Sequence, residues 1–247
     1  MIRGLYTAAS GMIYENKRQE NIAQNISNVQ TPGFKQTYLN AISQEEGVLV
    51  NNNGENVVGS LTMKVKIDDA FIQLQQGDLQ TSNQSLDFAI EGDGFFTLQG
   101  ADGLLYTRDG RFTLDDTGQL VSKEGYPVLV SDTKGNVQPV MTSNSLTVSS
   151  DGTFYSGMDN YQFVISDLND INQISKQGNS LFSYEGQANI GDSDFSIHQY
   201  MIEGSNVDAT DALVDMIAIN RSLQSNSKVL TIIDETLQAT VSEIGRV

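Results

Sequence analysis

The feature that most restricts the fold of this chain is a stretch without glycine or proline, from Asp211 to Ile244. A helix of these 34 residues would be about 50 Å long. Apolar residues recur along it at every third or fourth position, which predicts an amphipathic helix. Ser205 and Asp208 resemble a capping box at its start, and Gly245 would close it. The stripe contains Ala209, Leu213, Met216, Asn220, Leu223, Ser227, Leu230, Asp234, Leu237, Val241 and Ile244, widened by Ile217, Val229 and Ile233.

The opposite end of the chain has a similar pattern, which predicts a second helix. Thr31-Pro32-Gly33 would end it, because proline cannot continue a helical ladder. Such narrow stripes cannot close a globular core, so each needs another helix, either from the same chain or from a neighbouring subunit. Polar residues within the stripes favour packing between subunits, where they would fix the register. The N-terminal stripe contains Ile2, Leu5, Ala9, Met12, Asn16, Gln19, Ala23 and Ile26.

Between the helices, from about Leu61 to Met201, the sequence is typical of short strands joined by tight turns. Turn signals such as Asp93-Gly94 and Asp109-Gly110 recur, and strands do not alternate with long helices as in a parallel α/β sheet. We therefore expect a mainly β central domain of short antiparallel strands, with long N- and C-terminal α-helices that form a coiled-coil-like layer. The expected divisions are an N-terminal helix at 1–35, an extended linker at 36–80, the β domain at 81–200 and a C-terminal helix at 201–247.

Composition argues against most enzymes and against nucleic acid as a partner. The formal charge is −17, cysteine is absent, and His198 is the single histidine. The acidic groups Asp115-Asp116, Asp167 with Asp170 and Asp192 with Asp194 are best interpreted as turn residues. The segment from Glu91 to Phe96 lacks the third glycine of a dinucleotide turn. We expect no catalytic residue, metal site, cofactor or small-molecule substrate.

No stretch of the sequence resembles a secretory signal or a membrane-spanning helix. The segment that begins at Met1 is interrupted by Thr7, Ser10 and Gly11, and no apolar run approaches 20 residues. The chain is therefore expected either in the cytoplasm or on an export route that uses no cleaved signal.

Three separate motifs resemble the rod and hook axial proteins of the bacterial flagellum. The first runs from Asn21 to Lys35, and the last contains Glu203-Gly204-Ser205-Asn206-Val207-Asp208 followed by Met216-Ile217. The central one comprises Leu86 to Phe96, Tyr106 to Phe112 and Gly118 to Val121. The central motif and the short length favour a rod protein over a hook protein, whereas a distal and a proximal rod position remain equally possible.

The resemblance implies a structural protein, copies of which assemble into a hollow helical tube. Such proteins are exported unfolded through the flagellar type III apparatus, reside in the basal body within the cell envelope, contact other rod and hook axial proteins, and transmit torque. Their terminal helices build the inner tube. The predicted subunit-interface residues are Leu5, Met12, Asn25, Ile26, Asn28, Gly33, Phe34, Asn206, Val207, Leu213, Met216, Ile217, Asn220, Leu223, Leu230 and Leu237.

Alternatives of other classes remain at the level of sequence. A hook or hook-junction axial protein would share the motifs. A secreted β-rich adhesin or wall-binding protein would use the Asn-, Ser- and Thr-rich surface but leaves the terminal stripes unexplained. A wall hydrolase would need two carboxylates that converge in a cleft.

Overall fold

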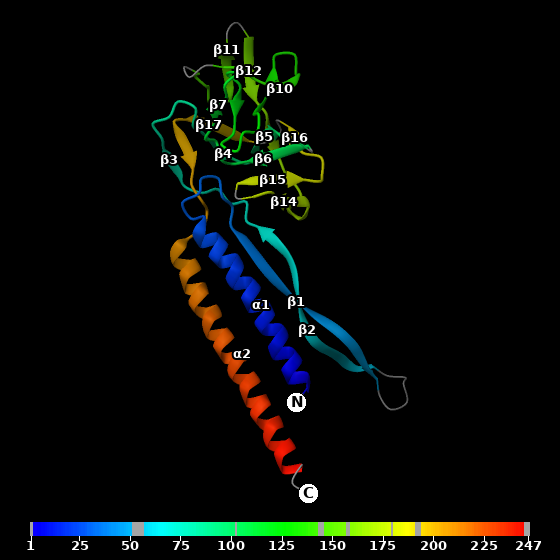
Figure 1. Ribbon diagram of the computed structural model, residues 1–247. Helices are drawn as coiled ribbons and strands as arrows, with labels where there is room; N and C mark the ends of the chain where they lie inside the picture. The colour runs from blue at the N-terminus through cyan, green and yellow to red at the C-terminus, as the bar shows by residue number, and fades with distance from the viewer. Residues whose placement is uncertain are drawn as a thin grey trace. The chain divides into compact units, whose positions relative to one another are not determined.

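The computed structural model describes residues 2–50, 57–101, 103–142, 146–156, 159–178, 180–190 and 194–244 (Figure 1). It divides into two compact units, each assembled from segments that are distant in the sequence. The helical unit contains Met1–Ile26, Thr37–Phe71 and Asp208–Val247, and the β unit contains Ser27–Gln36 and Ile72–Val207. The predicted β centre with a helix toward each terminus is confirmed. No described helix has the length and apolar character needed to cross a membrane.

The helical unit is built on two antiparallel helices, α1 (Ile2–Ser27) and α2 (Ala209–Ile244), which lie side by side (Figure 1). Three contacts define their register. The Ser222 hydroxyl donates to Glu15 at 2.9 Å. A Cβ built on Gly11 would lie 3.4 Å from Asn226 Nδ2, and one built on Gly4 would lie 3.6 Å from Ile233 Cδ1. The two helices therefore approach closely where α1 carries small residues.

The face of α2 that meets α1 differs from the predicted stripe. Met216, Leu223 and Leu230 belong to both, but Leu213 and Asn220 are exposed. The reason is that the small residues of α1 determine where the helices approach, rather than the largest apolar residues of α2. We call the α2 face that meets α1 the inner seam. It contains the buried and half-buried residues Ala212, Met216, Ile219, Leu223, Asn226, Leu230 and Ile233, and the residues of α1 shown to face it are Gly4, Gly11 and Glu15.

A main-chain turn follows the end of α1, and a side chain caps the start of α2. Helix α1 ends at Ser27, four residues before the predicted stop, and Thr31 then donates from its main-chain nitrogen to Asn28 O at 3.1 Å. At the start of α2, Asp208 Oδ1 accepts from the main-chain nitrogens of Thr210 and Asp211, at 2.7 and 3.2 Å. The capping carboxylate is therefore Asp208 alone rather than a Ser205–Asp208 box. Gly245 lies outside the described residues.

The segment expected to be an extended linker contains two long strands instead. Strands β1 (Thr37–Val50) and β2 (Val57–Ile72) pair as a two-stranded sheet. The sequence from 61 to 67 alternates apolar and polar residues, the period of a β-strand, and this signal explains the difference. Asn25 ties the start of β1 to α1, because its side-chain amide donates to Thr37 O at 2.8 Å and accepts from Thr37 N at 3.2 Å.

The β unit contains short strands, and every pairing between them in the described residues is antiparallel. A six-stranded sheet has the order β14-β15-β6-β5-β13-β16, and a four-stranded sheet has the order β10-β9-β12-β11. Three two-stranded sheets, β17-β4, β18-β3 and β7-β8, complete it. The strands are β3 (Leu79–Thr81), β4 (Phe88–Gly92), β5 (Phe95–Gln99), β6 (Leu104–Thr107), β7 (Thr113–Leu114), β8 (Leu120–Val121), β9 (Leu129–Asp132), β10 (Val137–Pro139), β11 (Thr153–Ser156), β12 (Asp159–Phe163), β13 (Ile165–Asp167), β14 (Ile174–Lys176), β15 (Leu181–Tyr184), β16 (Asn189–Ile190), β17 (Phe195–Gln199) and β18 (Met201–Glu203).

A continuous apolar core lies between these sheets. Its centre is a group of phenylalanine rings packed mostly edge to face or tilted, with centroids 5.1 to 6.3 Å apart, a range in which aromatic pairs attract one another. Aliphatic side chains from the surrounding strands and turns enclose the rings. The β unit therefore has a core of its own, into which the rings of Phe88, Phe96, Phe112, Phe154 and Phe163 are packed.

Candidate functional site

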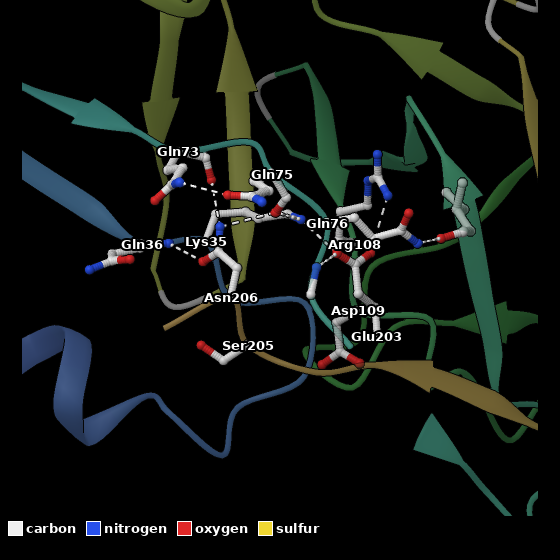
Figure 2. A network of polar contacts seen from close by, with 12 residues as sticks. Lys35, Gln36, Gln73, Gln75, Gln76, Arg108, Asp109, Glu203, Ser205 and Asn206 are labelled. Carbon is white, nitrogen blue, oxygen red and sulfur yellow. Dashed lines mark hydrogen bonds and ion pairs between the residues drawn. The ribbon is translucent and has the colours of Figure 1, made fainter. Parts of the chain in front are cut away.

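The parts of the β unit that carry the three sequence motifs meet at one buried polar cluster (Figure 2). Its centre is Glu203, the last residue of β18, whose side chain is 0% exposed. Glu203 Oε1 accepts from Lys35 Nζ at 2.6 Å and from Gly77 N at 3.0 Å, and Oε2 accepts from Arg108 Nη1 at 3.1 Å. We call Lys35, Arg108 and Glu203 the junction cluster.

The two cations of the junction cluster are also held by main-chain oxygens. Lys35 Nζ donates to Gln75 O at 2.9 Å, and Arg108 Nη2 donates to Gly92 O at 2.8 Å. Burial lowers the pKa of Lys35, since it disfavours the charged ammonium, and the Glu203 carboxylate only partly offsets this effect. A buried charge whose partner is removed costs about 3–5 kcal/mol. The cluster therefore fixes residue 35 against residue 203 strongly, although the two are far apart in the sequence.

Main-chain contacts around the junction cluster tie the same two segments together. Gly33 N donates to Glu203 O at 2.9 Å. The Asn206 side-chain amide accepts from Gln36 N at 2.7 Å and donates to the carbonyl oxygens of Gln73 and Gln75, at 2.9 and 3.0 Å. The segments by which the chain leaves the β unit toward α1 and toward α2 are thus joined side by side.

Gly33 cannot be replaced without disturbing this arrangement. Its φ is +69°, and a Cβ at this position would lie 2.3 Å from the main-chain nitrogen of Asp109. The glycine therefore lets the 27–36 segment approach the turn after β6 at a distance that no side chain permits.

Phe34 anchors the same segment next to the junction cluster. It is fully buried, and Lys176 Nζ lies 3.5 Å from its ring centroid, a cation–π contact. Among the described residues, no hydrogen-bond acceptor reaches this buried ammonium. Burial lowers the pKa of Lys176 to about 8. Within the described part of the chain, the cation–π contact with the ring of Phe34 is therefore the contact that stabilises the Lys176 ammonium.

The predicted interface residues fall into three groups by exposure. Leu213, Ile217, Asn220 and Leu237 are exposed on α2. The half-buried residues are Leu5, Met12, Ile26, Asn206, Met216, Leu223 and Leu230. The residues covered by their own chain are Asn25, Asn28, Gly33, Phe34 and Val207. The covered group makes contacts within one subunit, so that only the exposed group and parts of the half-buried group present surface to another copy.

Of the acidic groups, Asp115 and Asp170 cap a turn and a short 3-10 helix, whereas Asp167 is the last residue of β13. Asp115 Oδ1 accepts from Thr117 N and Gln119 N, both at 2.8 Å, and Asp170 Oδ1 accepts from Asn172 N at 3.1 Å. Hydrogen bonds, chiefly the one from the Thr117 side chain, lower the pKa of Asp115. Asp192 lies outside the described residues. Among the residues that the structure describes, no three His, Asp or Glu side chains are grouped as around a metal ion.

His198 and the cleft beside β7 lack the geometry of known hydrolytic sites. His198 Nε2 lies 2.6 Å from Glu91 Oε2 and 3.2 Å from Ser196 Oγ, so one nitrogen serves both neighbours. A Ser-His-acid triad uses the two ring nitrogens separately. A cleft of about 570 Å³ is lined by a single carboxylate, Asp87, together with Arg111 and Lys123 among other residues. Glycoside hydrolysis requires a pair of carboxylates.

The charged residues of the junction cluster are ones to which the sequence analysis assigned no role. Lys35, Arg108 and Glu203 each stand within a resembling motif, but nothing in one sequence pairs them. The available signal was that each of the three motifs contains one of these charged residues.

Comparisons with known proteins give a consistent result along the whole chain. Residues 5–35 match a family described as flagella basal body rod protein, residues 89–156 match the flagellar hook protein FlgE/F/G D1 domain, and residues 198–243 match the flagellar basal body rod FlgEFG protein C-terminal family. The chain is 32% identical to the flagellar basal-body rod protein FlgG of Bacillus subtilis, over 98% of this chain and 99% of that protein. It is 33% identical to FlgG of Borreliella burgdorferi, over 96% of this chain and 97% of that protein, and 29% identical to the rod protein FlgF of Caulobacter vibrioides, over the full length of both.

Proposed function

Because this chain belongs to the flagellar basal-body rod protein family, we propose that it is a structural component of the flagellar rod. In this role, copies of the chain polymerise into a hollow helical tube that transmits torque from the motor to the hook. The family is a structural one, and its members named above are rod proteins over the whole length of this chain. The basal body is accordingly the proposed location, reached through the type III export apparatus without a cleaved signal.

The observation that carries the proposal is the junction cluster. A subunit that transmits torque must pass force between its helices and its β unit along the covalent chain. The two segments that make this passage, 33–36 and 203–206, are joined by the Lys35–Glu203 ion pair and by the hydrogen bonds of Gly33 and Asn206. Force that enters through either helix is therefore shared by both segments.

In the tube, we propose that α1 and α2 form the coiled-coil-like layer and that other rod and hook axial proteins lie above and below. Support comes from the amount of large apolar surface that the helical unit leaves exposed, including Tyr6, Ile13, Leu213, Val214 and Ile217. Contiguous exposed apolar surface of this kind is typical of protein interfaces. Neighbouring subunits would cover it.

The test is genetic and structural. A strain without this chain should lose motility, and its basal bodies should lack part of the rod. The full-length chain should restore both, and antibody labelling of isolated basal bodies should find it there. Normal rods and swimming in the deletion strain would contradict the proposal. A matched pair of complementing variants, Glu203→Gln and the exposed Glu185→Gln, should differ, with loss of swimming only in the first.

A further inference from the structure

The hydrogen-bonded ladder along one edge of β7 stops one rung short. Phe112, just before β7, donates from its main-chain nitrogen to Leu86 O at 3.2 Å. Main-chain groups two residues apart on a strand point to the same side, so the next rung of this ladder would join Leu114 to Gln84. In the described ranges, however, neither the main-chain nitrogen nor the main-chain oxygen of Leu114 has a hydrogen-bond partner. The edge of β7 that faces away from β8 is therefore free at Leu114.

The segment that would supply the missing rung forms a turn instead. Gln84 O accepts from Asp87 N at 3.4 Å, and Gln84 N donates to Ser82 Oγ at 3.2 Å. Tyr200 holds both ends of this turn, because its nitrogen donates to Asp87 O at 2.9 Å and its oxygen accepts from Ser82 N at 2.7 Å. The φ of Tyr200 is +62°, a value that a bulky side chain disfavours. Strained backbone of this kind is concentrated at functional sites.

The turn and β7 diverge at the cleft of about 570 Å³ described above. Its volume lies in the range of ligand sites, about 300–1,000 Å³. Leu86, Phe112 and Leu114 supply apolar groups to the lining, and Gln84 and Thr113 supply polar ones. The free main-chain groups of Leu114 therefore belong to the wall of a cleft that is large enough for a ligand.

Lys123 is the cation of this cleft that has no ion-pair partner in the described part of the chain. Arg111 is already neutralised, since its Nε and Nη2 donate to the two carboxylate oxygens of Asp109 at 2.9 and 2.6 Å. The carboxylate of Asp87 accepts from the hydroxyl of Ser82. A ligand in the cleft would therefore meet one exposed, unpaired ammonium close to a free strand edge.

We propose that this cleft binds an extended peptide segment of a partner protein. The segment adds to β7 as a strand, with its main chain hydrogen-bonded to Leu114 and a carboxylate beside Lys123. Strand addition takes its affinity from main-chain hydrogen bonds and its specificity from side chains. A peptide, unlike a free anion, has both the acceptor and the donor that the N–H and the C=O of Leu114 require. The proposal concerns the β unit and goes beyond the rod function.

Amide hydrogen exchange of the full-length chain, followed by NMR, tests the pairing at Leu114 itself. The probe is the acetylated and amidated pentapeptide Thr-Val-Glu-Val-Thr at millimolar concentration. The control is the same peptide with an N-methylated main chain, which cannot pair as a strand. In the free chain, Leu114 N–H should exchange faster than Phe112 N–H, which is bonded to Leu86 O. The probe should slow the exchange of Leu114 about tenfold, and the N-methylated peptide should not.

A matched pair of variants tests the charge. Lys123 and Lys134 are both exposed, but Lys134 lies in the turn between β9 and β10 and does not line the cleft. Lys123→Glu should weaken binding of the probe about five- to tenfold, and Lys134→Glu should leave it unchanged. Equal affinity of the two variants would overturn the proposal.

The exchange rates give two further outcomes that would overturn the proposal. One is that the probe and the N-methylated peptide change the exchange of Leu114 equally, or not at all. The other is protection of Leu114 in the free chain that grows with chain concentration, which would mean that a second copy occupies the cleft. None of these measurements involves the rod, so the rod function is decided separately by the deletion strain.

Discussion

The β unit and the helical unit solve the problem of burying apolar surface in opposite ways. The β unit encloses phenylalanine rings between its sheets and fixes its two exit segments with a buried ion cluster. The helical unit has one narrow seam with glycine, serine and asparagine in it, and leaves several large apolar side chains of α2 in water. The first unit therefore has a closed core of its own, whereas the exposed apolar side chains of the second are the surface that the proposed function assigns to neighbouring copies.

The largest expected effect is on the β unit, from Glu203→Gln. This variant leaves the Lys35 and Arg108 cations buried without their carboxylate, and we expect a loss of about 3–5 kcal/mol in the free energy of unfolding. Urea unfolding followed by tyrosine fluorescence measures it. The exposed Glu185→Gln is the control and should unfold as the wild type does. Equal stability of the two variants would show that the junction cluster contributes little.

A smaller effect is expected in the helical unit from Ile219→Ala. Ile219 is buried within the inner seam, and the deletion of its side-chain carbons should cost about 2–3 kcal/mol in helix pairing. Thermal loss of the helical circular dichroism signal should come earlier, while the β unit unfolds as before. The control is Ile217→Ala, which removes the same atoms from an exposed site on the same helix. An identical shift in both variants would contradict the assignment of the inner seam.

Gly33→Ala tests how much the close approach of the 27–36 segment to the turn after β6 contributes to the stability of the β unit. The left-handed backbone and the close approach to Asp109 N together should cost about 1–3 kcal/mol. Gly125 separates the two causes, since its φ is +89° but a Cβ there would meet nothing within 4 Å. Gly125→Ala should therefore lose only the part due to backbone strain. Equal losses in the two variants would mean that the 27–36 segment can move away from the turn at little cost.

The last expected effect depends on pH and concerns the Lys176 ammonium over the ring of Phe34. Its pKa of about 8 lies below the ordinary value of 10.5, so between these pH values the unfolded chain holds more protons than the folded one. The contribution of Lys176 to stability therefore rises with pH from about 8 to 10.5 and is constant below. Lys176→Met should remove this rise from the stability–pH curve. Parallel curves for the variant and the wild type would show that the ammonium is hydrated in the folded chain.

Local patterns in the sequence were sufficient for the helices, the β centre and the turns. The helix periodicity predicted α1 and α2, and the Asp-containing turns are where turn chemistry placed them. The face of α2 that packs against α1 was predicted only in part. It depends on small residues of α1 such as Gly11, whereas the prediction followed the large apolar residues of α2. The pairing of β1 and β2 was not predicted, because residues 36–80 were expected to be an extended linker although the sequence from about Leu61 already has the alternation of a strand.

The junction cluster could not be predicted from one sequence for a physical reason. Lys35 and Glu203 are 168 residues apart, and each alone is an ordinary charged residue. Their burial depends on the entire β unit bringing them together, which no local pattern reports. The sequence therefore indicated which segments were unusual, and only the three-dimensional arrangement shows that they meet.

The same separation in the sequence limits when the junction cluster can form during synthesis of the chain. A chain that emerges from its amino end presents Lys35 early, but its carboxylate partner arrives only when about four-fifths of the whole chain has been made. Until then the Lys35 ammonium has no carboxylate partner, and closing so long a loop is slow as well as entropically costly. The junction cluster is therefore one of the last parts of the β unit that can form as the chain is synthesised.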